Sequence, residues 1–194
     1  MTSAPIPLAV AKADARRAAY ARRREAHAAL GPAPAPATGT LIQAIRDALP
    51  EGGAVSGFLP IRTEIDPRPA MAALHAEGVR ICVPVVRGEG LALAFREWSP
   101  DAALEAGPFG AQVPAAGAWL TPDAVIAPLV AYDDARMRLG YGGGFYDRTL
   151  AALAEAAGAP VPAIGFAFSA QRSTVPLPSE ATDRPLDRVV TELG

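Results

Sequence analysis

The chain has 194 residues, of which 51% are hydrophobic and 20% charged, and its formal net charge is −2. This is the composition of an ordinary globular protein, long enough for one domain with a substantial core, and its charge gives no electrostatic case for a nucleic-acid partner. The single cysteine, Cys82, excludes an intramolecular disulfide and fits a reducing cytoplasm. We expect the stretch MTSAPIPLAVAKADARR not to be a signal peptide, because its short apolar run precedes its positive charges. No apolar run approaches the roughly 18 residues that indicate a membrane span.

The first predicted element is a basic helix over residues 7–29. Leu8 and several alanines recur at helical spacing, and six basic residues against two acidic ones give this segment a net charge of +4. Periodicity favours a solvated basic face, and we expect this of Arg17 and of Arg22–Arg24. Lys12 differs from its neighbours because it is the only lysine in the chain, whose other basic positions all hold arginine.

An α/β body is predicted to follow the helix. The stretch GPAPAPATG, residues 31–39, indicates an extended Pro/Ala linker, and the body spans residues 40–194 of a single domain, 1–194. Within the body, helices are predicted over 41–49, 67–78 and 145–157, strands over 54–61, 80–86, 91–97, 123–132, 162–168 and 187–192, and a loop-rich stretch over 98–123. This alternation predicts an α/β, Rossmann-like fold of three layers, in which a mostly parallel central sheet carries helices on both faces.

The stretch RLGYGGGFYDRTL, residues 138–150, places four glycines between an apolar strand and a helix. Open α/β sheets bind ligands at such junctions, and bare glycine backbone lets a phosphate reach the free N–H groups of a helix N-terminus. The spacing matches neither a Walker loop, which needs a lysine, nor a dinucleotide fingerprint, in which Phe145 would have to be glycine. Phosphate binding is the favoured interpretation, and a plain flexible connection is the alternative.

RLGYGGGFYDR resembles the signature of the 5-formyltetrahydrofolate cyclo-ligase family, also called 5,10-methenyltetrahydrofolate synthetase. Five other segments match this family in order: KADAR (12–16), FLPIRTEID (58–66), RICVPVV (80–86), DAVIAPLVAYDD (123–134) and LDRVVTE (186–192). The resemblance implies ATP-dependent cyclisation of 5-formyltetrahydrofolate to 5,10-methenyltetrahydrofolate, with release of ADP and phosphate. ATP would phosphorylate the formyl oxygen, N10 would attack the activated carbon, and phosphate would leave. The protein would chiefly position the reactants and neutralise charge.

The resemblance also implies a nucleotide site with Mg²⁺ as cofactor. Lys12 and Arg16 are one helical turn apart and share a face, from which they would reach the ATP phosphates. The phosphates would also contact a continuous stretch: Arg138, Leu139, Gly140, Tyr141, Gly142, Gly143, Gly144, Phe145 and Tyr146. Within this set, Lys12, Arg138 and Tyr146 would be catalytic. Asp147 and Asp187 would bind the metal, since Mg²⁺ prefers carboxylate and phosphate oxygens; the alternatives are a helix N-cap for Asp147 and a surface aspartate for Asp187.

The implied folate site uses Leu59, Glu64 and Phe109 together with Tyr141, Gly142, Gly143, Gly144 and Phe145. The Glu64 carboxylate suits the N–H donors of the pterin, although without the resemblance Glu64 would be interpreted as a loop charge. Phe109 lies where the family carries an aromatic that stacks on folate. The sequence departs from the family at Arg136, in place of a common glycine, and at Gly143, in place of a lysine in some members.

Two rival functions remain at this point. One is a different ATP- or phosphate-using α/β protein, which would give no reason for Lys12, Glu64 and Asp187 to match together. The other is a non-catalytic folate- or nucleotide-binding relative, against which the intact Lys12, Arg138, Asp147 and Glu64 argue. We expect a cytoplasmic enzyme, a monomer, with small-molecule substrates and with neither nucleic-acid nor membrane partners.

Overall fold

The computed structural model describes residues 7–180 and 182–194, so most of the N-terminal stretch expected not to be a signal peptide is described, but its first six residues are not. The described elements are, in chain order, α1 (Leu8–Leu30), α2 (Ala35–Ala48), β1 (Ala54–Ser56), α3 (Arg68–Ala76), β2 (Arg80–Val85), β3 (Ala94–Glu97), β4 (Leu104–Ala106), η1 (Pro108–Gly110), β5 (Gln112–Pro114), β6 (Trp119–Leu120), β7 (Ala124–Pro128), β8 (Ala131–Tyr132), β9 (Arg138–Leu139), α4 (Phe145–Ala157), β10 (Ala163–Phe166), η2 (Ser169–Gln171) and β11 (Arg188–Val190). No helix in this part of the chain combines the length and the hydropathy that crossing a bilayer requires.

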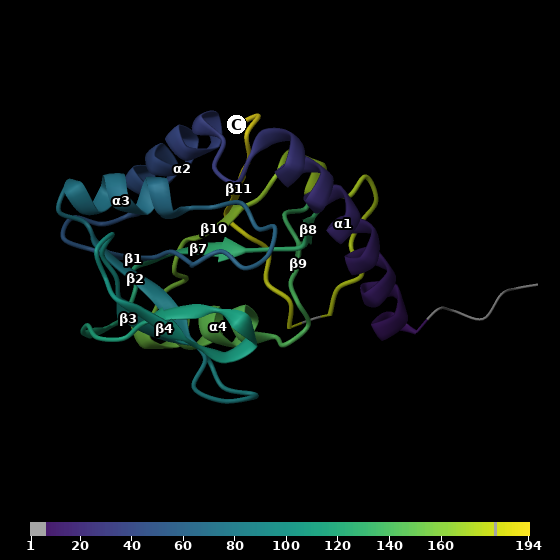
Figure 1. Ribbon diagram of the computed structural model, residues 1–194. Helices are drawn as coiled ribbons and strands as arrows, with labels where there is room; N and C mark the ends of the chain where they lie inside the picture. The colour runs from purple at the N-terminus through teal and green to yellow at the C-terminus, as the bar shows by residue number, and fades with distance from the viewer. Residues whose placement is uncertain (1–6, 181) are drawn as a thin grey trace, which may run out of the picture.

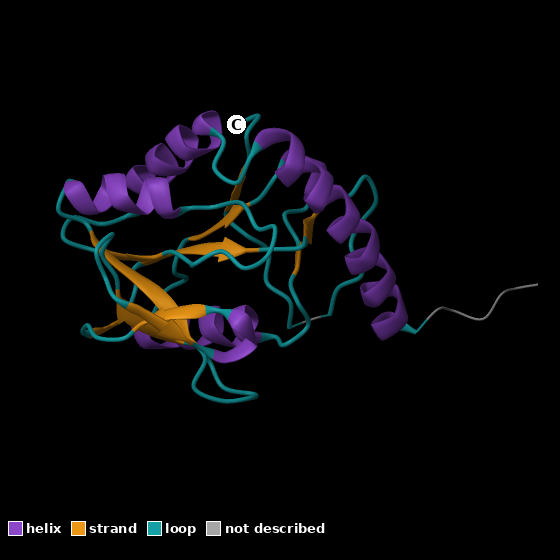
Figure 2. Ribbon diagram, in the orientation of Figure 1, coloured by secondary structure: helices purple, strands orange, loops and turns teal. Residues whose placement is uncertain are grey.

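A seven-stranded sheet in the order β11-β10-β7-β1-β2-β3-β6 lies between two helical layers (Figures 1 and 2). The strands from β11 to β2 are parallel, and β3 and β6 complete one edge in the antiparallel sense. Successive residues of β7 serve opposite faces: Ile126 packs in the core beneath α2 and α3, and Val125 packs in the core beneath α4. A strand buried on both faces has to be apolar throughout, as β7 is. The predicted α/β fold with helices on both faces is confirmed.

Helix α1 crosses the carboxyl end of the sheet. It contacts β8 and η2, which follow the carboxyl ends of β7 and β10 respectively. Ala19 of α1 is fully buried in a small apolar cluster with Ala131 of β8 and Leu139 of β9. Because open α/β sheets bind ligands beyond the carboxyl ends of their strands, α1 lies where a ligand site is expected.

The helices that flank the predicted site have the expected bounds, within about a residue. Gly31 directly follows α1, Gly144 directly precedes α4 and Gly158 directly follows it, and all three have positive φ. Glycine adopts this left-handed conformation without the steric cost that a Cβ imposes, so it suits a helix end.

Several predicted elements differ from the observed ones. The extended linker ends at residue 34, because Pro36 fits the first turn of α2, where a missing N–H costs nothing. The strand predicted over 54–61 contains only β1, and the loop after it folds around Glu64. The strand predicted over 123–132 is divided into β7 and β8, because Val130 leaves the central sheet and pairs with Leu139. The stretch predicted as loop-rich, 98–123, also contains a short hairpin, β4–β5.

Candidate active site

The glycine loop, residues 140–144, links β9 to α4 and is built from glycine for two reasons. Gly142 and Gly144 have φ values of +105° and +63°, which strain residues with a Cβ. A Cβ at Gly143 would lie 2.7 Å from the Phe145 ring. Gly144 is the N-cap of α4, and within the described residues no side chain caps the helix. The loop therefore presents bare backbone at a helix N-terminus, an arrangement suited to phosphate.

Arg16 joins α1 to the glycine loop. Its Nε donates a hydrogen bond of 2.8 Å to the carbonyl oxygen of Gly140. Its guanidinium also lies against Gly142, where an added Cβ would come within 3.3 Å of Nη2. Two residues predicted to contact the ATP phosphates, Arg16 and Gly142, are therefore adjacent in space although 126 positions apart.

Lys12, one turn earlier on α1, faces two carboxylates. Its Nζ lies 2.8 Å from Asp183 Oδ2 and 3.4 Å from Glu180 Oε2, and its side chain is only 13% exposed. Burial alone would lower the pKa of Lys12, but the hydrogen bond and charge of Asp183, with the charge of Glu180, outweigh it and raise the pKa. The ammonium group therefore stays charged, and two anionic groups hold it.

Arg138 and Asp147 form the third charged contact of this region. Arg138 Nη2 lies 2.7 Å from Asp147 Oδ1, and the Arg138 side chain is 4% exposed. Arg138 Nη1 donates a hydrogen bond to the carbonyl oxygen of Arg184. The backbone N–H of Arg184 in turn donates to Asp147 Oδ1 at 3.3 Å. Glu180 and Asp183 thus contact Lys12, while Arg184 contacts Arg138 and Asp147.

Glu64 lies on the other side of the glycine loop and is 5% exposed. Its Oε1 accepts a hydrogen bond of 2.6 Å from the Tyr141 hydroxyl, and its Oε2 accepts one of 2.8 Å from the N–H of Ile61. Burial raises the pKa of Glu64, and the hydrogen bonds from Tyr141 and Ile61 and the charge of Arg23 offset part of that rise. Burial and the Glu64 charge also raise the pKa of Tyr141, so its hydroxyl remains a proton donor at neutral pH.

The remaining side chains predicted to bind the substrates, two aromatic and one aliphatic, have different environments. The Tyr146 hydroxyl is buried and has no hydrogen-bond partner among the described residues, and burial raises its pKa. Phe109 is 74% exposed, and its ring centroid lies 6.0 Å from that of Phe145 at the start of α4. Leu59 is partly buried against the core beneath α2 and α3. The structure thus places the Phe109 ring beside the first residue of α4, directly after the glycine loop.

The carboxylate of Asp187 is bonded to the backbone of β10. Its Oδ2 accepts a hydrogen bond of 2.7 Å from the N–H of Ala163, at the start of β10. No group of three or more His, Cys, Asp or Glu residues in the described chain could hold a metal ion by itself.

One arginine expected on a solvated face is buried. Arg23 is 1% exposed, so that prediction is wrong for Arg23, whereas Arg17 and Arg24 are exposed as expected. Arg22 is half-buried and donates to the carbonyl oxygen of Ala170. The signal for Arg23 was its spacing, since residues 12, 16 and 23 lie on one face of a helix. The contact of Asp183 with Lys12 had no comparable signal, because it depends on the path of a loop.

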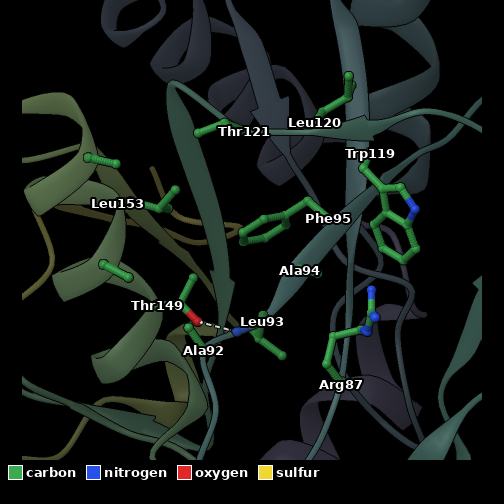
Figure 3. Close-up of a pocket in the computed structure, with 12 residues that line it drawn as sticks. Arg87, Ala92, Leu93, Ala94, Phe95, Trp119, Leu120, Thr121, Thr149 and Leu153 are labelled. Carbon is green, nitrogen blue, oxygen red and sulfur yellow. Dashed lines mark hydrogen bonds between the residues drawn. The ribbon is translucent and has the colours of Figure 1, made fainter.

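A cavity of about 390 Å³ lies away from these residues, between α4 and the edge strands β3 and β6 (Figure 3). It is lined mainly by apolar side chains, among them Phe95, Leu120 and Leu153, with Arg87 and Trp119 at one side. None of the residues predicted for the nucleotide or folate site lines it. The charged cluster around the glycine loop, and not this cavity, has the chemistry of a phosphate site.

Sequence comparisons identify relatives of the chain. The model of the 5-formyltetrahydrofolate cyclo-ligase family matches residues 11–192. The 5-formyltetrahydrofolate cyclo-ligase of Escherichia coli (strain K12) is 35% identical over 143 residues, which cover 71% of this chain and 76% of that protein. The enzyme of the same name from Mycolicibacterium smegmatis is 32% identical over 109 residues, or 51% of this chain and 55% of that protein.

Solved structures agree with the sequence comparisons. The NMR structure of Aquifex aeolicus 5,10-methenyltetrahydrofolate synthetase superimposes with a TM-score of 0.68 and 26% identity, covering 94% of this chain and 90% of that one. The 5,10-methenyltetrahydrofolate synthetase from Mycoplasma pneumoniae gives the same TM-score at 19% identity, covering 93% of this chain and 98% of that one, and supports the fold alone.

Proposed function

The chain belongs to the 5-formyltetrahydrofolate cyclo-ligase family, and from that membership we infer its reaction: ATP-dependent cyclisation of 5-formyltetrahydrofolate to 5,10-methenyltetrahydrofolate, with release of ADP and phosphate. The chain is therefore an enzyme, a ligase that forms a C–N bond. A non-catalytic relative is not favoured, because Lys12, Arg138, Asp147 and Glu64 are all present and lie around one loop.

The observation that carries the proposed site is the double attachment of the glycine loop. On one side, the Gly140 carbonyl is bonded to Arg16, which shares a helix face with Lys12. On the other side, Tyr141 is bonded to Glu64. A nucleotide phosphate held by the first group and a pterin held by the second would meet across this loop.

In the proposed mechanism the ATP γ-phosphate is transferred to the formyl oxygen of the substrate. N10 then attacks the activated formyl carbon, the imidazoline ring closes, and inorganic phosphate leaves. Lys12, Arg16 and Arg138 supply positive charge where the phosphoryl group passes, and the loop backbone and Phe145 hold the reactants in position. The buried Tyr146 hydroxyl has no hydrogen-bond partner among residues 7–180 and 182–194, which supports a role as a donor to a ligand.

Lys12 would exchange its partners when ATP binds. In the protein alone, the ammonium group of Lys12 is paired with the carboxylates of Asp183 and Glu180. Phosphate oxygens could replace them, because they are also negatively charged hydrogen-bond acceptors. The charge of Lys12 is thus already compensated in the protein alone. The transfer of Lys12 to ATP would release Glu180 and Asp183.

We propose Mg²⁺ as the cofactor, with Asp147 as its protein ligand. Asp147 Oδ1 takes the hydrogen bonds from Arg138 and Arg184, and the carboxylate is 27% exposed beside the loop. Mg²⁺ needs only one or two carboxylates when substrate phosphates complete its coordination, so the residues present fit this ion. The ion would neutralise phosphate charge. Asp187 as a second ligand stays a prediction from the resemblance, since its carboxylate is bonded to Ala163 here.

The folate is proposed to bind beside Glu64, with the carboxylate accepting hydrogen bonds from the pterin. Leu59 would supply an apolar contact, and the exposed Phe109 ring would stack on the folate next to Phe145. Positive φ at Phe109 supports this role, because a strained backbone at an exposed aromatic is typical of a functional position.

The remaining expectations are proposals as well. The contacts of α1 with the glycine loop support one domain that includes both the N-terminal helix and the α/β body. We propose that the enzyme is a cytoplasmic monomer without nucleic-acid or membrane partners, for which its single, buried cysteine and its weak net charge are the support.

A direct assay tests the function. The purified chain is mixed with 5-formyltetrahydrofolate, ATP and Mg²⁺, and the methenyl chromophore is followed by absorbance while ADP is quantified. We expect equal amounts of both products, and no product when ATP is omitted. A folded protein that consumes no ATP with this substrate would refute the assignment.

A further inference from the structure

Arg23 is a buried charge with an unusual set of partners. Its side chain is 1% exposed, and it donates from Nε to Thr63 Oγ1 at 3.2 Å and from Nη1 to the Tyr141 hydroxyl at 2.8 Å. Its guanidinium also stacks near the rings of Tyr20 and Tyr141, with Cζ 5.4 and 5.7 Å from the ring centroids. Burying a charge is costly, so such an arginine needs a full set of hydrogen bonds or charges around it.

The residues that bind Arg23 also lie next to Glu64. Thr63 precedes Glu64 in the chain, Tyr141 donates to Glu64 Oε1, and Arg23 Nη1 itself lies 3.8 Å from that oxygen. The planar guanidinium can hold Thr63 and Tyr141 simultaneously because its donors point in fixed directions. It therefore fixes the loop that carries Glu64 relative to the glycine loop.

We propose that Arg23 is a positioning residue for folate: from α1 it holds the Glu64 carboxylate and the Tyr141 hydroxyl in the arrangement that accepts the pterin. This inference rests on the proposed function. It adds a third member to the helix face of Lys12 and Arg16, with a separate task. Lys12 and Arg16 serve the nucleotide, whereas Arg23 acts on folate through Glu64.

A double-mutant cycle tests whether Arg23 acts through Glu64. Binding of 5-formyltetrahydrofolate to the full chain is measured by calorimetry for the wild type, Arg23→Gln, Glu64→Gln and the double variant. We expect each single change to weaken binding about tenfold or more, and the double variant to lie within about threefold of Glu64→Gln, because residues of one network are not additive. The ATP affinity should change by less than about threefold. A general loss of structure would instead weaken the binding of both substrates.

Arg24→Gln is the matched control, since Arg24 is the exposed neighbour on the same helix; it should leave both affinities unchanged. Additive losses in the cycle, or equal losses of ATP and folate affinity, would overturn the inference. If Arg23→Gln does not fold, Tyr141→Phe and Thr63→Val each remove one partner of Arg23 and keep the size of the side chain. Unchanged folate binding in both would also overturn it. A wild-type chain that does not bind the folate at all refutes the proposed function and this inference together, whereas binding with additive losses refutes only the inference.

Discussion

The Tyr141 hydroxyl donates a hydrogen bond of 2.6 Å to Glu64 Oε1, across 77 positions of the chain. This contact ties the glycine loop to the loop that follows β1, and Glu64 is nearly inaccessible to water. A ligand that replaces the tyrosine as the donor to Glu64 would free the glycine loop on one side.

Lys12→Arg is expected to lower activity about tenfold or more, equivalent to about 1.4 kcal/mol of transition-state stabilisation. An ammonium is a compact charge that fits among phosphate oxygens, whereas a guanidinium is a wide planar fork. The free energy of unfolding should change by less than about 1 kcal/mol, because the charge is kept. Steady-state kinetics should show the ATP parameters affected more than the folate parameters. Arg17→Lys, at a side chain 81% exposed, is the control, and normal ATP kinetics in both Lys12→Arg and Lys12→Ala would contradict the assignment.

Binding of 5-formyltetrahydrofolate should weaken as the pH falls through the pKa of Glu64. Burial raises this pKa above the ordinary 4.5, so the loss begins at a higher pH than it would for an exposed glutamate; Arg23 and Arg62 limit the rise. The protonated carboxyl loses acceptor capacity toward the pterin donors. Calorimetric titrations at several pH values would detect this decrease in affinity, which forms the acidic limb of the pH profile. Glu64→Gln should bind the folate more weakly at neutral pH and lack the acidic limb. An acidic limb that persists in Glu64→Gln would show that another group titrates.

In steady-state kinetics, Glu64→Gln should mainly raise the folate KM. A raised ATP KM with an unchanged folate KM would assign Glu64 to the other substrate.

Gly142→Ala should impair ATP use beyond its effect on stability. The φ of +105° strains an alanine, and its Cβ would lie 3.3 Å from Arg16 Nη2. Gly78→Ala is the matched control, since Gly78 has a φ of +89° but open space around it. Both changes should lower the free energy of unfolding by about 1–2 kcal/mol in denaturant titrations. Only Gly142→Ala should raise the ATP KM. Equal kinetics in both variants would contradict the assignment of the glycine loop to the phosphate site.

Asp147→Asn should raise the Mg²⁺ concentration needed for half-maximal activity by about tenfold, since an amide is a weaker ligand than a carboxylate for a hard cation. Titrating Mg²⁺ at saturating ATP measures this. Asp187→Asn is informative beside it, because the amide oxygen can still accept the hydrogen bond from Ala163. A similar rise for Asp187→Asn would support a second ligand. An unchanged Mg²⁺ requirement in Asp147→Asn would exclude Asp147 as the ligand.

Arg136→Gly should raise the free energy of unfolding by up to about 1 kcal/mol, and Arg136→Val should lower it by about 1–2 kcal/mol. Arg136 has a φ of +61°, in the region that favours glycine. Its N–H and carbonyl bond to Asp133 and Leu186, so the turn is held despite the strain. Thermal or denaturant unfolding of the three proteins should give this order; a less stable Arg136→Gly would show that the arginine side chain stabilises the turn.

The sequence by itself determined the elements whose causes are local. The glycines at 142 and 144 specify a loop with positive φ, the apolar spacing after Phe145 specifies α4, and the helical spacing of Lys12 and Arg16 places them on one face. The run of apolar strands between helices likewise specified the α/β sheet, because a parallel strand must be apolar on both faces. Each helix, strand and turn depends on neighbours within a few positions of the chain, whereas the pairing of strands such as β1 and β7 joins distant segments.

Only the tertiary structure decided which charges meet. Burial of Arg23 beside Tyr141, the contact of Lys12 with Asp183, and the bond from Ala163 to Asp187 each join residues that are more than 20 positions apart. The sequence shows that such charges exist but not their partners, because a carboxylate in a loop can pair with any cation that the chain path brings near. Burial settles the choice. A charge removed from water must find a complementary group within a few ångströms, and packing of α1 against the carboxyl end of the sheet determines which groups lie within that distance.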